Sequence, residues 1–157
     1  MTTRRRILVT SALPYANGAI HLGHMLEHVQ TDIFVRFQRL EGHECIYVCA
    51  DDVHGTAVML NAQAAGQTPL DYAAEITKAH IQDFQAFQIS HDCYDTTHSD
   101  DNEQLSAEIY SRLLASGNIE KAAVEQLFDT EKGLFLADRF VVGGCPSCKT
   151  PEQYGDN

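Results

Sequence analysis

The segment that decides the fold is residues 6–52, RILVTSALPYANGAIHLGHMLEHVQTDIFVRFQRLEGHECIYVCADD. It begins with a short apolar run, residues 6–11, that ends before Pro14 and predicts a buried strand followed by a loop. Apolar residues every three or four positions up to Gly42 then predict an amphipathic helix. They are Leu26, Val29, Ile33, Phe37 and Leu40. A second apolar run, residues 45–50, stops at two aspartates and predicts another strand.

Strand, helix and strand in this order form a βαβ unit, whose strands we expect to be parallel and joined by a right-handed crossover. The expected fold class is therefore α/β. Further helices are predicted over residues 55–65 and from Thr68, an N-cap followed by proline. A last helix begins at Ser99 or Asp100 and ends at Gly117. The apolar faces expected for these last two helices are Ala73, Ile76, His80, Phe84 and Phe87, and then Leu105, Ile109 and Leu113.

The character of the sequence changes after Gly117. Two short apolar runs on either side of residues 129–133 predict a hairpin, and a Gly-Gly-Cys-Pro-x-Cys motif follows. We expect a domain boundary near Ala115, so that residues 1–115 form the α/β domain and residues 116–157 belong to a second one.

Composition and charge exclude several classes of protein. The chain has 157 residues, of which 44% are apolar, and no apolar tract long enough to span a membrane. The N-terminal MTTRRR precedes an apolar stretch too short and too proline-interrupted for a signal peptide, so we expect a cytoplasmic protein. The formal net charge of −11 opposes the large phosphate-contacting surface of duplex binders. We therefore expect neither a membrane nor a DNA partner.

The five cysteines divide into two groups. Cys45, Cys49 and Cys93 each stand alone in strand-like apolar surroundings, where a small thiol packs well, and we expect them in the core. Cys145 and Cys148 form a CxxC pair in loop-like sequence.

The loop after the first strand is the candidate ligand site, because ligands of open α/β sheets bind beyond the strand ends. The helix that follows offers unpaired N–H groups and a positive dipole end to an anion. Gly18 and Gly23 allow a ligand to approach the backbone closely. His21 and His24 lie three residues apart, so both imidazoles can donate hydrogen bonds to one phosphate group in a transition state. The segment contains neither a P-loop nor a dinucleotide-binding fingerprint.

Two alternatives stay open from the residues alone. The histidines could be ordinary helix residues satisfied by backbone or solvent. His24 and His28 also have the i,i+4 spacing of two ligands to one metal ion, although no HExxH glutamate lies between them. A metal-dependent hydrolase is the lesser interpretation.

The HLGH sequence at residues 21–24 resembles the HIGH signature of class I aminoacyl-tRNA synthetases. The segments CADDVHGTAVMLNAQAAG, THSDDN, LFDTEKGLFLADRFV and CPSCKTPEQYGDN follow in an order that resembles the methionyl-tRNA synthetase family from about Arg6 to Asn157. This resemblance implies the first half of a Rossmann-like catalytic domain with a parallel sheet, followed by the beginning of a zinc-binding connective domain.

The family's activity is ATP-dependent activation of methionine to methionyl-adenylate, followed by transfer to tRNA(Met), with Mg²⁺ shielding the pyrophosphate. The resemblance implies His21 and His24 as catalytic residues and a methionine site made by Leu13, Tyr15 and Asp52. The implied ATP-binding residues are Asn17, Gly18, His21, Gly23 and His24. From the residues alone, Asp52 could equally cap the next helix or bind magnesium.

The CPSC pair resembles half of the family's zinc knuckle, which implies Cys145 and Cys148 as Zn²⁺ ligands. A four-cysteine zinc site needs a second CxxC motif, which this sequence does not contain. Three explanations stay open: a truncated sequence, an incomplete site, or a simple cysteine pair in a turn. We favour truncation. A redox CxxC fits less well, because such motifs open a helix. The family's KMSKS loop and anticodon-binding domain do not occur in this sequence, so we do not expect this chain alone to aminoacylate tRNA. The alternative is a non-catalytic truncated paralogue or nucleotide-binding module.

Overall fold

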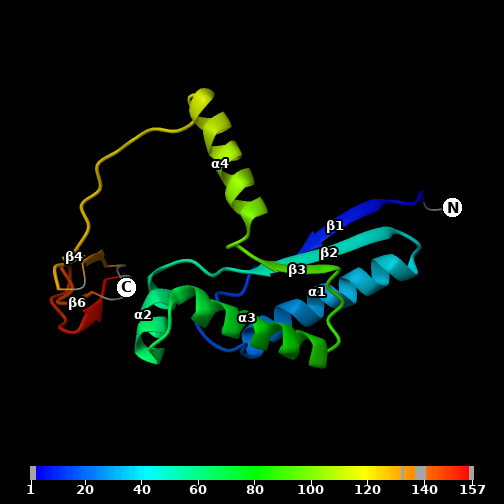
Figure 1. Ribbon diagram of the computed structural model, residues 1–157, viewed down its shortest axis with the longest axis horizontal. Coiled ribbons are helices and arrows are strands. Elements are labelled where there is room, and N and C mark those ends of the chain that lie inside the picture. Colours follow the sequence, from blue (N-terminus) through cyan, green and yellow to red (C-terminus); the bar gives the residue numbers. More distant parts are fainter. Residues whose placement is uncertain (1–2, 132, 137–140, 156–157) are drawn as a thin grey trace. The chain divides into compact units, whose positions relative to one another are not determined.

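The computed structural model describes residues 3–131, 133–136 and 141–155 (Figure 1). The chain divides into two compact units, Met1–Ser111 and Arg112–Asn157. The elements in chain order are β1 (Arg6–Thr10), α1 (Leu22–Leu40), β2 (Glu44–Asp51), α2 (Thr56–Ala65), α3 (Pro69–Ala86), β3 (Cys93–Thr96), α4 (Asp100–Ala115), β4 (Phe128–Asp129), β5 (Leu134–Phe135), β6 (Val142–Gly143) and β7 (Gln153–Tyr154).

The first unit is built on a three-stranded sheet in the order β1-β2-β3. All its strands are parallel, with Leu8 opposite Ile46 and Val48 opposite Cys93. The predicted βαβ unit and the α/β class are therefore confirmed. Strand β3 lies outside the predicted strands, because its four residues, CYDT, form no apolar run.

Helix α1 has the predicted position but not the predicted buried face. The helix ends before Gly42, whose φ of 84° suits glycine. Its buried residues are Met25, His28, Asp32 and Val35. The expected apolar face is largely exposed, with Leu26 61% and Ile33 62% accessible. The prediction was wrong because hydrogen-bonded polar residues, which the apolar periodicity ignores, occupy the buried side.

Helices α1 and α3 lie on one face of the sheet. Figure 1 shows α1 and α3 along the same side of the strands. On that face Tyr47, Cys45 and Val35 form a buried cluster with Ile7 and Val9 packed against it. The opposite face stays open, because Leu8 is 72% and Ile46 40% exposed.

Helices α2 and α3 begin as the sequence predicts. The hydroxyl of Thr68 accepts a hydrogen bond from the Asp71 backbone N–H at 3.1 Å, and Pro69 occupies the first turn of α3. On the predicted α3 face Ala73, His80 and Phe84 are buried. Phe87, however, is 61% exposed, since the helix ends there.

Helix α4 begins after Ser99, whose hydroxyl accepts the Asn102 N–H at 3.3 Å. Its predicted apolar residues are exposed, and no residue of α4 is buried within the described part of the chain. The expectation that Cys93 is a core residue is also wrong, because β3 is an edge strand and Cys93 is exposed there.

The second unit contains two small antiparallel pairs. Strand β4 pairs with β5 as the predicted hairpin, and β6 pairs with β7. Among all described residues, no helix is long and apolar enough to cross a membrane.

Candidate functional site

The loop between β1 and α1 continues the sheet beyond the end of β1. Tyr15 forms an isolated parallel bridge with Asp52. The Ala16 N–H donates to the Asp52 carbonyl, and the Asp52 N–H donates to the Pro14 carbonyl, each at 2.8 Å. This pairing brings Leu13, Tyr15 and Asp52 to the carboxyl edge of the strands. Leu13 and Asp52 are exposed there and Tyr15 is half-buried.

The Tyr15 side chain is fixed against Gly55. A Cβ atom added at Gly55 would lie 2.6 Å from the Tyr15 hydroxyl oxygen, and the φ of Gly55 is +119°. Only glycine therefore suits this position. Gly55 is also the N-cap of α2, which has no side-chain cap. The alternative in which Asp52 caps the next helix is thus not what the structure contains.

His21 and His24 cap the N-terminus of α1 reciprocally. His21 Nδ1 accepts from the Gly23 N–H at 3.1 Å and from the His24 N–H at 3.4 Å. His24 Nδ1 accepts from the His21 N–H at 3.4 Å. The two rings stack with centroids 3.7 Å apart and planes 15° from parallel. A Cβ at Gly23 would lie 3.0 Å from the His21 ring, so the glycine makes room for this stack.

This capping determines where the imidazole protons reside. Because each Nδ1 accepts a backbone N–H, the neutral rings carry their proton on Nε2. In the described part of the chain no hydrogen bond engages either Nε2 atom, and both rings reach solvent. Burial, followed by the nearby His21, lowers the pKa of His24 and keeps it neutral near pH 7. The helix start therefore presents the Nε2–H groups of both rings beside its positive dipole end, where an anion is favoured.

The backbone before α1 is held by three side chains from α2 and α3. The Asn17 carbonyl accepts from Asn61 Nδ2 at 2.6 Å and from the Tyr72 hydroxyl at 3.1 Å. The Gly18 carbonyl accepts from His80 Nε2 at 2.8 Å. A Cβ at Gly18 would meet nothing within 4 Å, which leaves open space beside this backbone.

The anchor at His80 is a feature of the candidate site that the sequence did not predict. His80 Nδ1 lies 2.8 Å from Asp51 Oδ1, and both side chains are wholly buried. Burial acts to lower the pKa of His80, but its hydrogen bonds to Asp51 and to the Gly18 carbonyl outweigh burial and raise it. The one available signal was a histidine on the apolar face of a predicted helix, and nothing in the sequence identified its partners.

His24 and His28, the pair with the spacing of two metal ligands, lie in different surroundings. His24 stacks on His21 at the surface, whereas His28 is 1% exposed and contacts His91 and Tyr47. The described residues therefore place His24 and His28 in different surroundings, without a shared ligand group.

The CPSC motif forms a tight turn in the second unit. The Cys148 N–H donates to Cys145 Sγ at 3.5 Å, and the Cys148 thiol lies 3.1 Å from the Thr150 hydroxyl. The hydrogen bonds from Thr150, aided by Cys145, lower the pKa of Cys148 to about 7. Both cysteines line a hollow of about 340 Å³. Their chemistry suits zinc, but they supply two of four ligands, and no third ligand joins them among the described residues.

A larger hollow lies elsewhere, with a volume of about 720 Å³. Its lining includes Leu70, Thr77 and Ile81 of α3 together with Val53 and Thr96. None of the predicted site residues lines it.

Comparisons with a family profile and with individual proteins point to the same family. The profile described as tRNA synthetases class I (M) matches residues 7–157. The chain is 61% identical over 153 residues to the methionine–tRNA ligases of Dichelobacter nodosus and Neisseria gonorrhoeae, covering 98% of this chain but 23% and 22% of those proteins. The chain thus spans less than a quarter of their length.

A solved structure supports the same family. Mycobacterium tuberculosis methionyl-tRNA synthetase in complex with methionyl-adenylate matches with a TM-score of 0.77 and 25% identity, covering 97% of this chain and 31% of that one. The Rossmann-like α/β fold is that of part of a class I synthetase catalytic domain. The chain therefore belongs to the class I (M) tRNA synthetase family, as a homologue of part of a methionine–tRNA ligase.

Proposed function

We propose that this chain supplies the ATP-binding and methionine-binding elements of a methionine–tRNA ligase. The observation that carries the proposal is the junction of β1 and α1, where one loop holds the capped histidines and Tyr15, which bridges to Asp52 at the end of β2. The solved relative from M. tuberculosis, whose bound molecule is methionyl-adenylate, supports it.

The reaction is an in-line attack of the methionine carboxylate on the α-phosphorus of ATP. Pyrophosphate leaves and methionyl-adenylate forms, from which methionine is transferred to tRNA(Met). Negative charge grows on the α-phosphoryl oxygens, and the Nε2–H groups of His21 and His24 donate to them. Asn17, Gly18 and Gly23 give ATP a close approach to the backbone. Mg²⁺, when bound to the ATP phosphates, supplies further charge neutralisation.

Methionine is bound by the other part of the loop. Leu13 and Tyr15 offer apolar and aromatic surface to the thioether. The exposed carboxylate of Asp52 pairs with the ammonium group. The bridge to Tyr15 holds the backbone of Asp52 on both sides. The bridge therefore orients the Asp52 side chain without engaging its carboxylate.

The second unit has a different role, which is to bind zinc. Residues 116–157 begin the connective domain, and Cys145 and Cys148 supply two thiolates of a zinc knuckle. The lowered pKa of Cys148 supports this role, because thiolate is the form that binds zinc. We place the whole protein in the cytoplasm.

The test is binding of a sulfamoyl analogue of methionyl-adenylate to the full chain by calorimetry. His21→Ala and His24→Ala are each expected to weaken binding about 10- to 100-fold, because each removes a hydrogen bond to a charged group. His43→Ala is the matched control, since its ring only accepts the Arg5 N–H at the other end of the sheet. Unchanged affinity in both site variants would remove these roles.

A second candidate is a non-catalytic nucleotide-binding module. It is favoured by the N-terminus of α1, whose capped histidines and positive dipole end suit anion binding without a catalytic step. Methionine-dependent ATP–pyrophosphate exchange separates the two candidates. Exchange by the full chain supports the ligase, binding of the analogue without exchange supports the module, and failure to bind contradicts both.

A further inference from the structure

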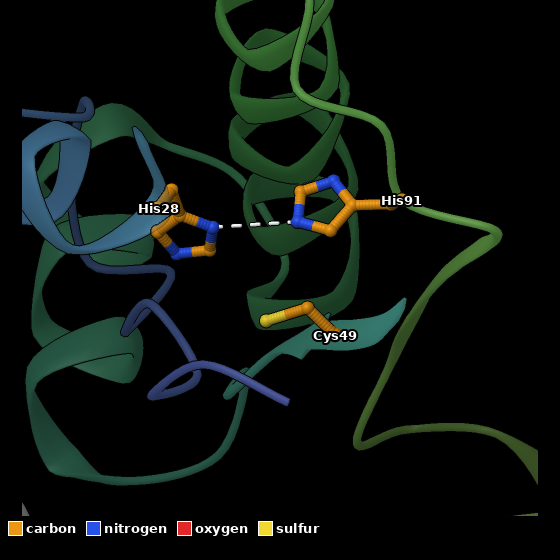
Figure 2. A group of neighbouring side chains, drawn as sticks. All are labelled: His28, Cys49 and His91. Carbon is orange, nitrogen blue, oxygen red and sulfur yellow. Dashed lines mark hydrogen bonds between the residues drawn. The ribbon is translucent and has the colours of Figure 1, made fainter. Parts of the chain in front are cut away.

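Three potential metal ligands converge between the sheet and its helices. His28 comes from α1, Cys49 from β2, and His91 from the segment between α3 and β3 (Figure 2). One ligand atom from each lies within 4.8 Å of the others. His28 and Cys49 are buried, and His91 is partly accessible. This group is separate from the ATP loop and from the CPSC turn.

The distance between the imidazoles fits a shared ion. His28 Nδ1 lies 3.3 Å from His91 Nε2. Two nitrogens bound to one tetrahedral zinc ion at about 2.0–2.1 Å stand about 3.3–3.4 Å apart. The two rings therefore already have the spacing of adjacent ligands, and Cys49 Sγ lies within 4.8 Å of a ligand nitrogen of each.

The hydrogen bonds at the His28 ring nitrogen that faces this centre are long. His28 Nδ1 faces the Ser11 hydroxyl, the Tyr47 hydroxyl and His91 Nε2, each at 3.3 Å. All three distances exceed the usual range for a hydrogen bond, and one ring nitrogen makes a single directed bond. These contacts therefore hold His28 Nδ1 only weakly, and a bond to a metal ion can replace them.

The protonation states also suit a metal. Burial, followed by the nearby His28, lowers the pKa of His91 to about 4, and burial likewise lowers the pKa of His28. Both rings are therefore neutral near pH 7, with lone pairs available. Burial raises the pKa of Cys49, so its thiol is protonated until a metal displaces the proton.

The centre has an approach from the surface and a fourth donor. A hollow of about 120 Å³ is lined by Phe84, Ile89, His91 and Tyr94, so an ion can enter beside the His91 ring. The Ser11 hydroxyl lies 3.3 Å from His28 Nδ1 and 3.4 Å from Cys49 Sγ.

We propose that His28, Cys49 and His91 form a zinc site, with the Ser11 hydroxyl oxygen as the fourth ligand. Two imidazoles and one thiolate select zinc over the hard cations Mg²⁺ and Ca²⁺. Binding exchanges the Cys49 S–H bond for a zinc–sulfur bond and releases one proton to solvent, so the charge balances. The site ties α1 to β2 and to the segment before β3, and it stabilises the sheet without touching the predicted substrates.

The experiment uses the full chain with Cys145→Ser and Cys148→Ser, which removes the other thiol pair. Co²⁺ is the spectroscopic probe, and Zn²⁺ is titrated by calorimetry in two buffers of different ionisation enthalpy. We expect one equivalent of Co²⁺ with a thiolate-to-cobalt absorption band, and about one proton released per Zn²⁺. Absence of that band would overturn the proposal.

Variants of single ligands then test the assignment. In the same background, Cys49→Ser and His91→Gln are expected to weaken Zn²⁺ binding by more than about 100-fold, beyond the effect typical of outer-shell partners. Cys45→Ser is the matched control, because Cys45 is buried on the same face of β2 but lies outside the ligand group. Zinc should raise the melting temperature of the control and not of the ligand variants. If Cys49→Ser does not fold, the partly exposed His91→Gln decides alone, and unchanged affinity there contradicts the site.

Discussion

His80 Nδ1 lies 2.8 Å from Asp51 Oδ1, in a pair whose side chains are both wholly buried. The other ring nitrogen of His80 donates to the Gly18 carbonyl, and these two hydrogen bonds raise the pKa of the ring. The same Asp51 oxygen accepts from the Tyr94 hydroxyl at 2.6 Å. One ion pair thus links α3, the end of β2, strand β3 and the loop that precedes α1.

Removing one partner of this pair should destabilise the fold strongly. His80→Gln leaves the Asp51 charge buried without its counter-ion, which costs about 3–5 kcal/mol. Urea unfolding measures the loss, and Glu75→Gln, an exposed change on the same helix, is the control. The double variant Asp51→Asn/His80→Gln should lose less than the sum of the single variants. Additive losses would contradict the pairing.

The pair also sets a pH dependence. The pKa of His80 is raised by its partners, so the folded chain holds this proton more tightly than the unfolded chain. The resulting stability is fully present below about pH 6.5, the ordinary histidine pKa, and is lost as the pH rises through the folded pKa. The free energy of unfolding should fall in that range by up to about 1.4 kcal/mol per pH unit. His80→Gln should lack this slope, and an equal slope in the variant would exclude His80 as its source.

Gly23→Ala should separate ligand binding from stability. The new Cβ presses on the His21 ring at 3.0 Å and moves it from the cap. Loss of a cap costs about 1 kcal/mol, whereas alanine favours the helix over glycine by a similar amount. The melting temperature should therefore change little, while binding of the adenylate analogue weakens about tenfold. Gly143→Ala, which meets no atom within 4 Å, is the control. Unchanged binding would mean that the orientation of His21 is unimportant for the ligand.

The parts of the fold that the sequence predicts are those made by neighbouring residues. The βαβ unit follows from apolar runs, and the Thr68 cap from a local motif. Strand β3 does not follow, because its pairing with β2 is imposed by the sheet and not by its own residues. The same limit applies to His80, whose partners lie 29 and 62 residues away.

The buried face of α1 shows a second reason why the sequence alone does not predict the whole structure. Periodicity selects apolar residues, but His28 and Asp32 are buried because they have partners in β2 and before β3. A helix with apolar residues on two sides gives no local sign of which side packs. The candidate loop was predictable because its residues are contiguous; the three-ligand group of His28, Cys49 and His91 comes from distant segments and was not.

Gly55→Ala should be costly, and a second change should relieve it. The φ of +119° is unfavourable for alanine, and the new Cβ would lie 2.6 Å from the Tyr15 hydroxyl oxygen. Together these cost about 1–3 kcal/mol or more. Adding Tyr15→Phe removes the hydroxyl oxygen with which the new Cβ would clash, and the nearest remaining atom of the Tyr15 ring lies at 3.5 Å. Part of the lost stability should therefore be regained. Gly66→Ala, with φ of +69° and open space, should cost only about 1 kcal/mol. No rescue by Tyr15→Phe would contradict the contact.

The open face of the sheet should make this chain bind hydrophobic dyes. Parallel sheets are usually covered on both faces, yet here Leu8 and Ile46 stand side by side and exposed. Anilinonaphthalene sulfonate fluorescence should be high in the folded state and should fall in Leu8→Thr/Ile46→Thr. Val124→Thr, an exposed residue of the second unit, is the control. Low fluorescence of the parent chain would indicate that this face is covered in solution.

Cys148 should be the most reactive thiol of the chain. Hydrogen bonds from Thr150 lower its pKa to about 7, and its side chain is exposed. About half of it is therefore thiolate at pH 7, whereas Cys45 and Cys49 are buried. The rate of iodoacetamide alkylation, followed by mass spectrometry of the modified peptide, should rise with pH around a midpoint near 7. Thr150→Val removes the hydroxyl that lies 3.1 Å from Cys148 Sγ and should move the midpoint upward. A midpoint that Thr150→Val leaves unchanged would show that the hydroxyl does not stabilise the thiolate.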